Sequence, residues 1–271
     1  MTQGHAQLRQ QRQGREYQID LSRIDSGGEV FGAVLLAFDV TEQAEAERMR
    51  REFTANVSHE LKTPLQSIIG SVELLEKDLV QPEDRPRFLG RIHQEAQRLV
   101  SLINDILGLS QLDEGAAMPR ESVSLLSLAQ EAAASLSAAA QAQNVTLTVN
   151  GTAGTLTGVR RLLSETVRNL CENAVKYNVS GGSITVTVAE TPRAVTLTVA
   201  DTGIGIPPAD QSRVFERFYR VDKSHSRAIG GTGLGLSIVK HAVAYHHGTV
   251  QLDSTPGQGT VITVTLPKDA A

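Results

Sequence analysis

The sequence predicts a chain of several domains, in which an antiparallel helical hairpin is followed by an α/β sandwich. Two observations predict the hairpin: apolar residues recur at alternating spacings of four and three in two neighbouring segments, and a proline-containing turn separates them. The sandwich is predicted by strand-like alternation interleaved with helical periodicity. The hairpin is expected over residues 42–116, and helices on one face of a mixed sheet over residues 117–271.

Composition restricts the possible functions. Hydrophobic residues make up 40% of the chain and charged residues 21%, as is ordinary for a soluble globular protein. A net charge of −4 argues against direct binding to nucleic acid. The single cysteine, Cys171, excludes an internal disulfide and the usual multi-cysteine metal sites. No apolar run is long enough to span a bilayer, so any membrane attachment is expected to come from an upstream segment.

Residues 1–41 are expected to be a flexible lead-in followed by the remnant of a larger domain. The Gln- and Arg-rich stretch 1–14 is predicted to be flexible, and two strands are predicted at 16–24 and 30–39. A hairpin turn is expected at Ser26-Gly27-Gly28. Two strands alone are marginally stable, which is why a remnant is favoured.

The hairpin follows from its apolar seams. A turn over 81–86, with Pro86 near a helix start, separates the two helices, and the second helix is expected to end near 113–115. A lone hairpin would leave the seams exposed, so dimerisation into a four-helix bundle is expected. The seam residues are Leu61, Leu65, Ile68, Val72, Leu75 and Leu79 in the first helix, and Ile92, Ala96, Leu99, Ile103 and Ile106 in the second.

Each element of the sandwich is predicted by its period. An Ala- and Leu-rich stretch and two segments of period 3.6 indicate helices, whereas alternation of period two indicates strands, and a glycine-rich irregular segment covers 203–235. The expected helices are 123–143, 161–177 and 236–245, and the expected strands are 145–150, 183–189, 194–200, 249–254 and 260–266.

One histidine of the first helix has neighbours suited to proton handling. Counted along the seam, His59 falls at heptad position b, Glu60 at c and Thr63 at f, so all three are expected on the solvent side. Glu60 could accept the imidazole proton while the other nitrogen of His59 attacks an electrophile. Pro64 is expected to bend or loosen the helix. The plain alternative is a surface histidine on a coiled coil.

Three later segments carry candidate ligand chemistry. On one predicted helix, Asn169, Asn173 and Lys176 lie near one face, where amide oxygens suit Mg²⁺ and a lysine suits phosphate. Asp201 ends a strand and is followed by glycines, and a glycine loop over 230–235 opens a helix, where backbone N–H groups can meet phosphate. The loop is neither a Walker A motif nor a Rossmann fingerprint. Taken singly, these segments could be an amphipathic helix, a turn and a surface loop.

The stretch FTANVSHELKTPL, residues 53–65, resembles the H-box of sensor histidine kinases, and most closely the group that regulates phosphate uptake and cell-wall metabolism. The resemblance implies that His59 accepts a phosphoryl group and that Glu60 assists proton transfer. It also implies that Thr63 takes part in dephosphorylating a response regulator.

The three later segments resemble the N-, G1- and G2-boxes of the histidine-kinase ATPase domain, with an F-box at 214–220 and a last glycine box at 257–260. The resemblance implies the Bergerat fold of gyrase, Hsp90 and MutL ATPases, which binds ATP and Mg²⁺. Asp201 would read the adenine amine, Asn173 and Asn169 would hold Mg²⁺, and residues 205–233 would form the ATP lid. The other implied nucleotide contacts are Lys176, Tyr177, Gly203, Gly205, Tyr219, Arg220, Gly231, Thr232, Gly233, Leu234, Gly235, Leu236 and Thr260.

The match covers roughly residues 42–268, and one departure is visible: the family often has Gly-Asp where this chain has Gly158-Val159. The end of the 16–39 strand pair, through Glu42, resembles the close of a PAS domain.

Together these features predict the cytoplasmic core of a membrane-anchored bacterial sensor kinase. It would form a homodimer, phosphorylate His59 from ATP and pass the phosphate to an aspartate of a response regulator. Two rivals are a clamp-type ATPase of the gyrase or Hsp90 kind and a non-enzymatic dimeric scaffold that binds nucleotide as a regulator.

Overall fold

The computed structural model describes residues 5–26, 29–113, 118–221 and 231–268. The chain divides into two compact units, residues 1–60 and 61–271, and helix α1 (Thr41–Glu76) contributes residues to both. Each unit is described by itself. In the described part of the chain, none of the helices has the combination of length and apolar character that a membrane span requires.

The first unit contains an antiparallel sheet in the order β1-β2-β3, formed by His5–Arg12, Arg15–Ser26 and Glu29–Asp39. The prediction of a flexible lead-in is therefore wrong over 5–12, which pairs along its whole length with β2. Gln13 and Gly14 form the two-residue turn between the strands, with φ angles of 51° and 78°. Such turns favour Asn-Gly or Gly-Gly, so the glutamine concealed the hairpin. Residues 27 and 28 of the second expected turn lie outside the described residues.

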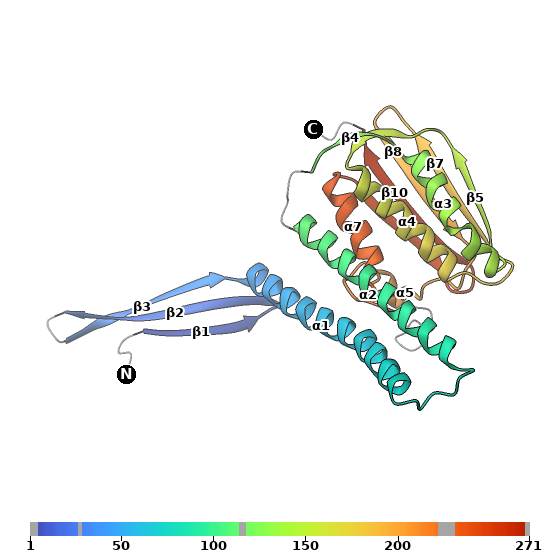
Figure 1. The fold of residues 1–271 in the computed structure, drawn as a ribbon. Coiled ribbons are helices and arrows are strands. Elements are labelled where there is room, and N and C mark those ends of the chain that lie inside the picture. The colour runs from blue at the N-terminus through green and yellow to red at the C-terminus, as the bar shows by residue number, and fades with distance from the viewer. Residues whose placement is uncertain (1–4, 27–28, 114–117, 222–230, 269–271) are drawn as a thin grey trace. The chain divides into compact units, whose positions relative to one another are not determined.

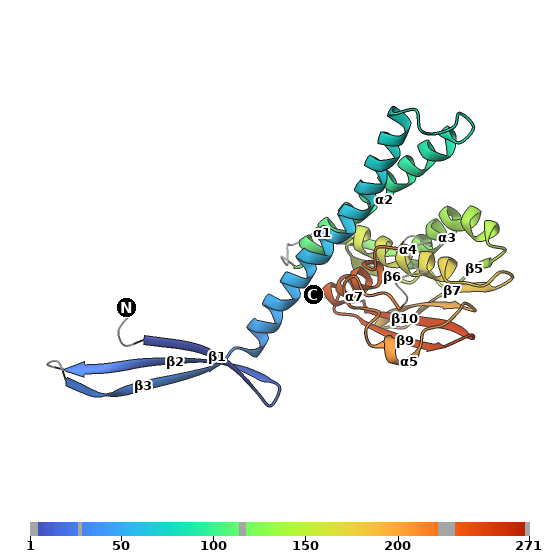
Figure 2. The ribbon, with the colours of Figure 1, turned by 90° about the horizontal axis from the view of Figure 1, so that it is seen from below.

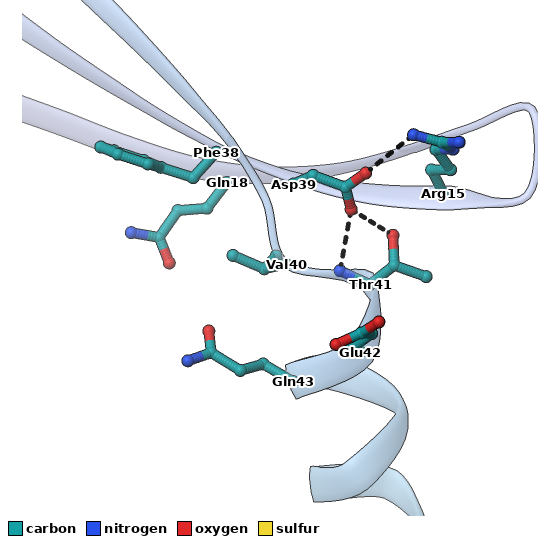
Figure 3. Close-up of a pocket in the computed structure, with 8 residues that line it drawn as sticks. All are labelled: Arg15, Gln18, Phe38, Asp39, Val40, Thr41, Glu42 and Gln43. Atoms are coloured by element: carbon teal, nitrogen blue, oxygen red, sulfur yellow. Dashed lines mark hydrogen bonds and ion pairs between the residues drawn. The ribbon is translucent and has the colours of Figure 1, made fainter.

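The junction between β3 and α1 is fixed by one carboxylate (Figure 3). Asp39 accepts hydrogen bonds from the backbone N–H of Thr41 at 3.1 Å and from its hydroxyl at 2.6 Å, and it pairs with Arg15 at 3.2 Å. The bonds from Thr41, followed by the charge of Arg15, lower the pKa of Asp39. The Thr41 hydroxyl oxygen in turn accepts the Glu16 N–H at 2.9 Å. Arg15, Asp39 and Thr41 border a hollow of about 850 Å³ between the strand ends and the first turn of α1.

The hairpin of the second unit consists of the end of α1 and of α2 (Arg85–Asp113). The turn between them is held by an Arg85–Asp78 ion pair of 2.7 Å. Seam residues Leu65 and Ile103 are exposed in the single chain, and Leu79 lies beyond the last residue of α1. The most deeply buried residues of α2 are instead Leu102 and Leu109.

The remainder of the second unit is a mixed sheet covered on one face by α3 (Leu125–Ala142), α4 (Arg160–Lys176) and α7 (Gly235–Tyr245), as Figures 1 and 2 show. The strand order is β5-β7-β8-β10-β9, with β5 parallel to β7 and the other neighbours antiparallel. The predicted sandwich is therefore confirmed. The strands are β5 (Thr146–Gly151), β7 (Ser183–Glu190), β8 (Ala194–Asp201), β9 (Thr249–Thr255) and β10 (Gly259–Pro267).

Every second residue of the central strands is buried, and these residues form the core. Ile184, Val186 and Val188 of β7 are buried toward the helices, together with the corresponding residues of β8. Two short strands escaped prediction: β4 (Glu121–Ser124) pairs with β6 (Thr155–Gly158). The helix expected from residue 123 consequently begins later, because the Ser124 side chain caps α3 by accepting the Ser127 N–H at 3.3 Å.

Candidate functional site

The site is built on the helix α4, which has an apolar face in the core and a polar face away from it. Asn169, Asn173 and Lys176 are half-buried, and their spacing places them on one side of the helix. The opposite side fixes the helix rotation, because its residues are buried against α3, α7 and the sheet. The buried residues are Leu162, Leu163, Thr166, Val167, Leu170, Cys171, Ala174 and Val175.

The glycine loop at the start of α7 lies directly against this polar face. A Cβ added at Gly231 would stand 2.4 Å from Lys176 Nζ, and one at Gly235 would stand 2.9 Å from Asn169 Oδ1. A side chain at either position would require Lys176 or Asn169 to move, and the loop backbone thus reaches the lysine and the amide. Leu234 is completely buried and anchors the loop, and Leu236 packs against the core at the first turn of α7.

Positive charge is concentrated at this end of the site. Burial, followed by the neighbouring charges of Arg220 and Arg98, lowers the pKa of Lys176 to about 8. The Lys176 ammonium lies 5.3 Å from the centre of the Tyr177 ring. Cations held close together in a partly desolvated site favour a polyanionic ligand such as a polyphosphate. Arg98 belongs to α2 and was not predicted, because it lies outside every recognised motif.

The other end of the site is the carboxylate of Asp201, at the last position of β8. Its Oδ1 accepts the backbone N–H groups of Gly203 at 2.8 Å and Thr260 at 3.2 Å. Among the described residues none bonds Oδ2, which leaves this oxygen for a ligand's N–H donor. Burial raises the pKa of Asp201, and the two backbone bonds oppose the rise. Gly203 also approaches α4, because a Cβ there would stand 2.3 Å from the Tyr177 carbonyl oxygen.

The segment after Asp201 is held by residues that the sequence did not single out. Gly205 has a φ of 67°, and the next N–H, of Ile206, donates to Ser254 Oγ at 2.8 Å. The Gln211 amide donates to the carbonyl oxygens of Ile206 at 2.9 Å and Ser254 at 2.7 Å. Gln211 and Ser254 thus tie the G1 loop to β9. Neither carries a sequence signal, since single polar residues in loops and on strands are common.

The F-box residues divide between two surroundings. The Tyr219 hydroxyl donates to Asp210 at 2.5 Å, and Arg213 lies 4.2 Å over its ring. Arg220, by contrast, is the F-box residue whose charge adds to the lowering of the Lys176 pKa by burial and opposes the rise that burial causes in the pKa of Tyr177. The F-box is joined to the glycine loop by the Phe218 N–H, which donates to the Gly233 carbonyl oxygen at 2.9 Å. Residues 222–230 of the expected ATP lid lie outside the described residues.

The phospho-acceptor candidate lies on α1. His59 and Thr63 are exposed and Glu60 is half-buried, which confirms the expected accessibility of His59. Pro64 is buried inside the same helix. Exposure on a rigid helix is what an imidazole needs if it is to meet an electrophile carried by another domain.

The position that departs from the family pattern is supported by a buried histidine. The Val159 N–H at the start of α4 donates to His246 Nε2 at 2.9 Å, and Nδ1 of the same ring donates to the Ala242 carbonyl oxygen at 2.7 Å. Val159 itself has no side chain that can cap α4. The ring of His246 lies so close to Gly158 that an added Cβ there would come within 3.0 Å of it.

Comparison with known proteins agrees with this geometry. Residues 49–115 match the family described as the His Kinase A (phospho-acceptor) domain, and residues 158–270 match the histidine kinase-, DNA gyrase B- and HSP90-like ATPases. The chain belongs to the sensor histidine kinases. Its ATPase domain is of the ATP-binding type.

The relatives of this sensor histidine kinase include the sensor-like histidine kinase SenX3 of Mycolicibacterium smegmatis. The two are 38% identical over 242 residues, which are 87% of this chain and 62% of SenX3. The sensor histidine kinase WalK of Bacillus subtilis is 38% identical over 254 residues, 89% of this chain and 40% of WalK. The chain thus spans about half the length of these relatives. The crystal structure of histidine kinase ThkA in complex with the response regulator TrrA has the same fold, with a TM-score of 0.64, 22% identity and coverage of 98% of this chain and 79% of that one.

Proposed function

We propose that this chain is the signalling core of a sensor kinase, which transfers the γ-phosphoryl group of ATP to His59 and then to an aspartate of a response regulator. In the first step, a nitrogen of His59 attacks the γ-phosphorus, the bond to the ADP oxygen breaks, and Glu60 takes the imidazole proton. The observation that carries the proposal is that one chain contains both an exposed His59 followed by Glu60 and a pocket with Lys176 at one end and Asp201 at the other.

Different pocket residues bind different parts of the nucleotide. Asp201 Oδ2 accepts the adenine amine, while Lys176, Arg220 and the loop backbone receive the phosphates. Asn173 and Asn169 hold Mg²⁺, which offsets phosphate charge when bound. The donors suit this ion, because both amides are half-buried and Asn169 Oδ1 faces the glycine loop. Among the described residues no cluster of three or more His, Cys, Asp or Glu could hold a metal, so amides and phosphates are the ligands proposed.

The remaining parts follow the same proposal. Residues 42–116 form the dimerisation and phosphotransfer hairpin, residues 117–271 the catalytic domain, and residues 1–41 the close of a PAS domain. The response-regulator partner is supported by the ThkA–TrrA complex, and dimerisation by the phospho-acceptor family match. Thr63 serves the reverse, phosphatase reaction. The chain acts in the cytoplasm, and an upstream segment attaches it to the membrane.

The proposal is tested by incubating the protein with γ-labelled ATP and measuring acid-labile phosphoprotein. His59→Gln should abolish the label while ATP binding is retained, and Glu60→Gln should slow labelling by about 10²- to 10⁴-fold, as expected for loss of a general base. The matched control is His93→Gln, which changes another exposed helical histidine and should label normally.

The same assay separates the two rivals. A clamp ATPase would release phosphate at equal rates in the wild type and in His59→Gln, with no stable label on the protein. A regulatory scaffold would bind ATP without labelling either variant. Equal labelling of His59→Gln and wild type would refute the assignment of His59.

A further inference from the structure

A carboxylate of the hairpin is bonded to the phosphate loop of the catalytic domain. The Thr232 hydroxyl donates to Asp105 Oδ2 at 3.1 Å, and its oxygen accepts the Leu234 N–H at 3.3 Å. Asp105 belongs to α2, within the buried stripe that contains Leu102 and Leu109. The bond therefore joins two elements that the sequence assigns to different functions.

Asp105 sits where phosphate charge is expected. Gly231, directly before Thr232, lies against Lys176, and Gly235, three residues after it, lies against Asn169. A polyphosphate received by this loop would bring several negative charges close to the carboxylate, which at partial burial is only weakly screened. Like charges at short range in such surroundings repel each other.

The groups that face Asp105 do not neutralise it. Glu165, Arg168 and Glu172 of α4 act on its charge, and the one cation among these three is paired with Glu172 at 3.2 Å. Burial accordingly raises the pKa of Asp105 to about 6, although the Thr232 bond and the Arg168 charge oppose this. At neutral pH the group is still mostly ionised, in a position that disfavours its charge.

Other contacts between α2 and the catalytic domain do not involve the phosphate loop. The Arg161 guanidinium donates to Gln111 Oε1 at 2.6 Å, and the Met118 N–H after the end of α2 donates to the Tyr245 hydroxyl at 3.1 Å. The α2 helix is thus held by several contacts, and of these three only the Asp105–Thr232 bond is made by the phosphate loop itself.

We infer that the Asp105–Thr232 contact is a nucleotide-sensitive latch between the hairpin and the catalytic domain. Polyphosphate in the glycine loop repels Asp105 and weakens the contact, and by linkage the contact weakens polyphosphate binding by the same factor. Asp105 is a positioning residue, which keeps the catalytic domain on α2 until ATP arrives. The inference deepens the proposed function, since it requires that the glycine loop receive the phosphates, but it does not require transfer to His59.

The first test compares nucleotides of different charge. Asp105→Asn keeps the size of the side chain and an oxygen that can accept the Thr232 hydroxyl, but removes the charge. In calorimetric titrations it should tighten ATP binding by about 3- to 10-fold, tighten ADP binding less, and leave adenosine binding unchanged. The charge-matched control is Glu131→Gln, which removes a carboxylate of α3 that pairs with Arg160 of α4. It should change none of the three affinities.

The second test follows the separation of α2 from the catalytic domain. Gln111→Cys and Arg161→Cys are introduced together, and a short bis-maleimide cross-links them; Cys171 does not compete, because it is buried and its thiol has a pKa raised to about 12. ATP should slow cross-linking when Asp105 is present and have no effect when Asp105→Asn is added.

The outcomes separate the latch from the proposed function. If the wild type binds no ATP, the proposed function fails. If it binds ATP but Asp105→Asn binds ATP equally well, or tightens adenosine as much as ATP, the latch is wrong and the proposed function stands. A cross-linking rate that ATP leaves unchanged with Asp105 present would also overturn the latch.

Discussion

Lys176 is the residue whose charge links nucleotide binding to pH. Burial lowers its pKa to about 8 in the free pocket, and a bound polyphosphate would raise it. Binding should therefore take up a proton around pH 8 to 9, and ATP affinity should fall as pH rises from about 8 toward the higher pKa of the bound state, by up to about tenfold per pH unit. Calorimetric titrations in buffers of different ionisation enthalpy measure the proton uptake.

The control variant keeps a positive charge at position 176 but does not titrate near pH 8. Lys176→Arg stays cationic throughout this range, so its ATP affinity should be nearly independent of pH between 8 and 9. Proton release on binding, or the same slope in Lys176→Arg, would contradict the role given to Lys176.

At the same scale, motifs predicted the residues proposed to touch the nucleotide, but not the residues that hold these in place. Asn169, Lys176 and Asp201 lie within recognisable boxes; in the structure Asn169 and Lys176 border the glycine loop, and Asp201 accepts the Gly203 N–H at the end of β8. Asp105, Arg98 and the Gln211–Ser254 pair come from segments with no motif. Their roles depend on which elements pack together, and spacing along the sequence carries no information on that. The one sequence feature that could have indicated Asp105 is the presence of a carboxylate within the apolar stripe of α2.

Among the elements, α4 depends on a histidine that is distant in sequence. His246 can accept the Val159 N–H only while Nε2 is unprotonated, and burial lowers the pKa of this ring. A depressed folded-state pKa means that the stabilisation is complete above the ordinary histidine value of 6.5 and is lost as pH falls below it toward the folded-state value. The start of α4 should therefore weaken in acid.

Urea unfolding of His246→Leu tests this. At pH 8 the substitution should cost about 1–3 kcal/mol, because the buried Val159 N–H loses its acceptor. The difference from wild type should shrink at pH 5.5. His93→Leu, at an exposed histidine of α2, should leave the pH dependence of wild type intact. A constant difference between wild type and His246→Leu at both pH values would count against the mechanism.

The elements with strong periods were predicted to within two residues, and those fixed by pairing were not. The α4 helix and the strands β7 and β8 follow their patterns closely. The strand β1 was read as flexible because its residues are polar on both faces, and β4 and β6 are only four residues each. Such strands exist because a neighbour satisfies their backbone groups, which is a tertiary effect.

For the whole molecule, an exposed apolar stripe on the hairpin, which shares only Leu65 and Ile103 with the predicted seam, is the feature that calls for a second copy. Val100, Ile103 and Leu107 of α2 recur at spacings of three and four and are between 46 and 59% exposed, and Leu65 and Ile69 of α1 are 48% exposed. Apolar residues repeated along one face are seldom left in water. The proposed dimer would bury them in a four-helix bundle.

Ile103→Glu should therefore shift the protein from dimer to monomer, since a buried unpaired carboxylate is strongly disfavoured in a helical seam. Analytical ultracentrifugation measures the mass. Ser101→Glu, at another exposed position of α2, is the matched control and should remain dimeric. An unchanged dimer mass for Ile103→Glu would place the interface elsewhere.

The position of β10 has a consequence for how the catalytic domain is made. This strand, the last of the described strands, lies inside the sheet between β8 and β9, and it alone connects them. Pairing of Thr260 with Asp201 also brings the Asp201 carboxylate its second N–H donor. A growing chain that has not yet exposed residues 259–267 can complete neither the sheet nor the Asp201 end of the pocket. Synthesis would therefore deliver the phospho-acceptor helix well before a catalytic domain able to act on it.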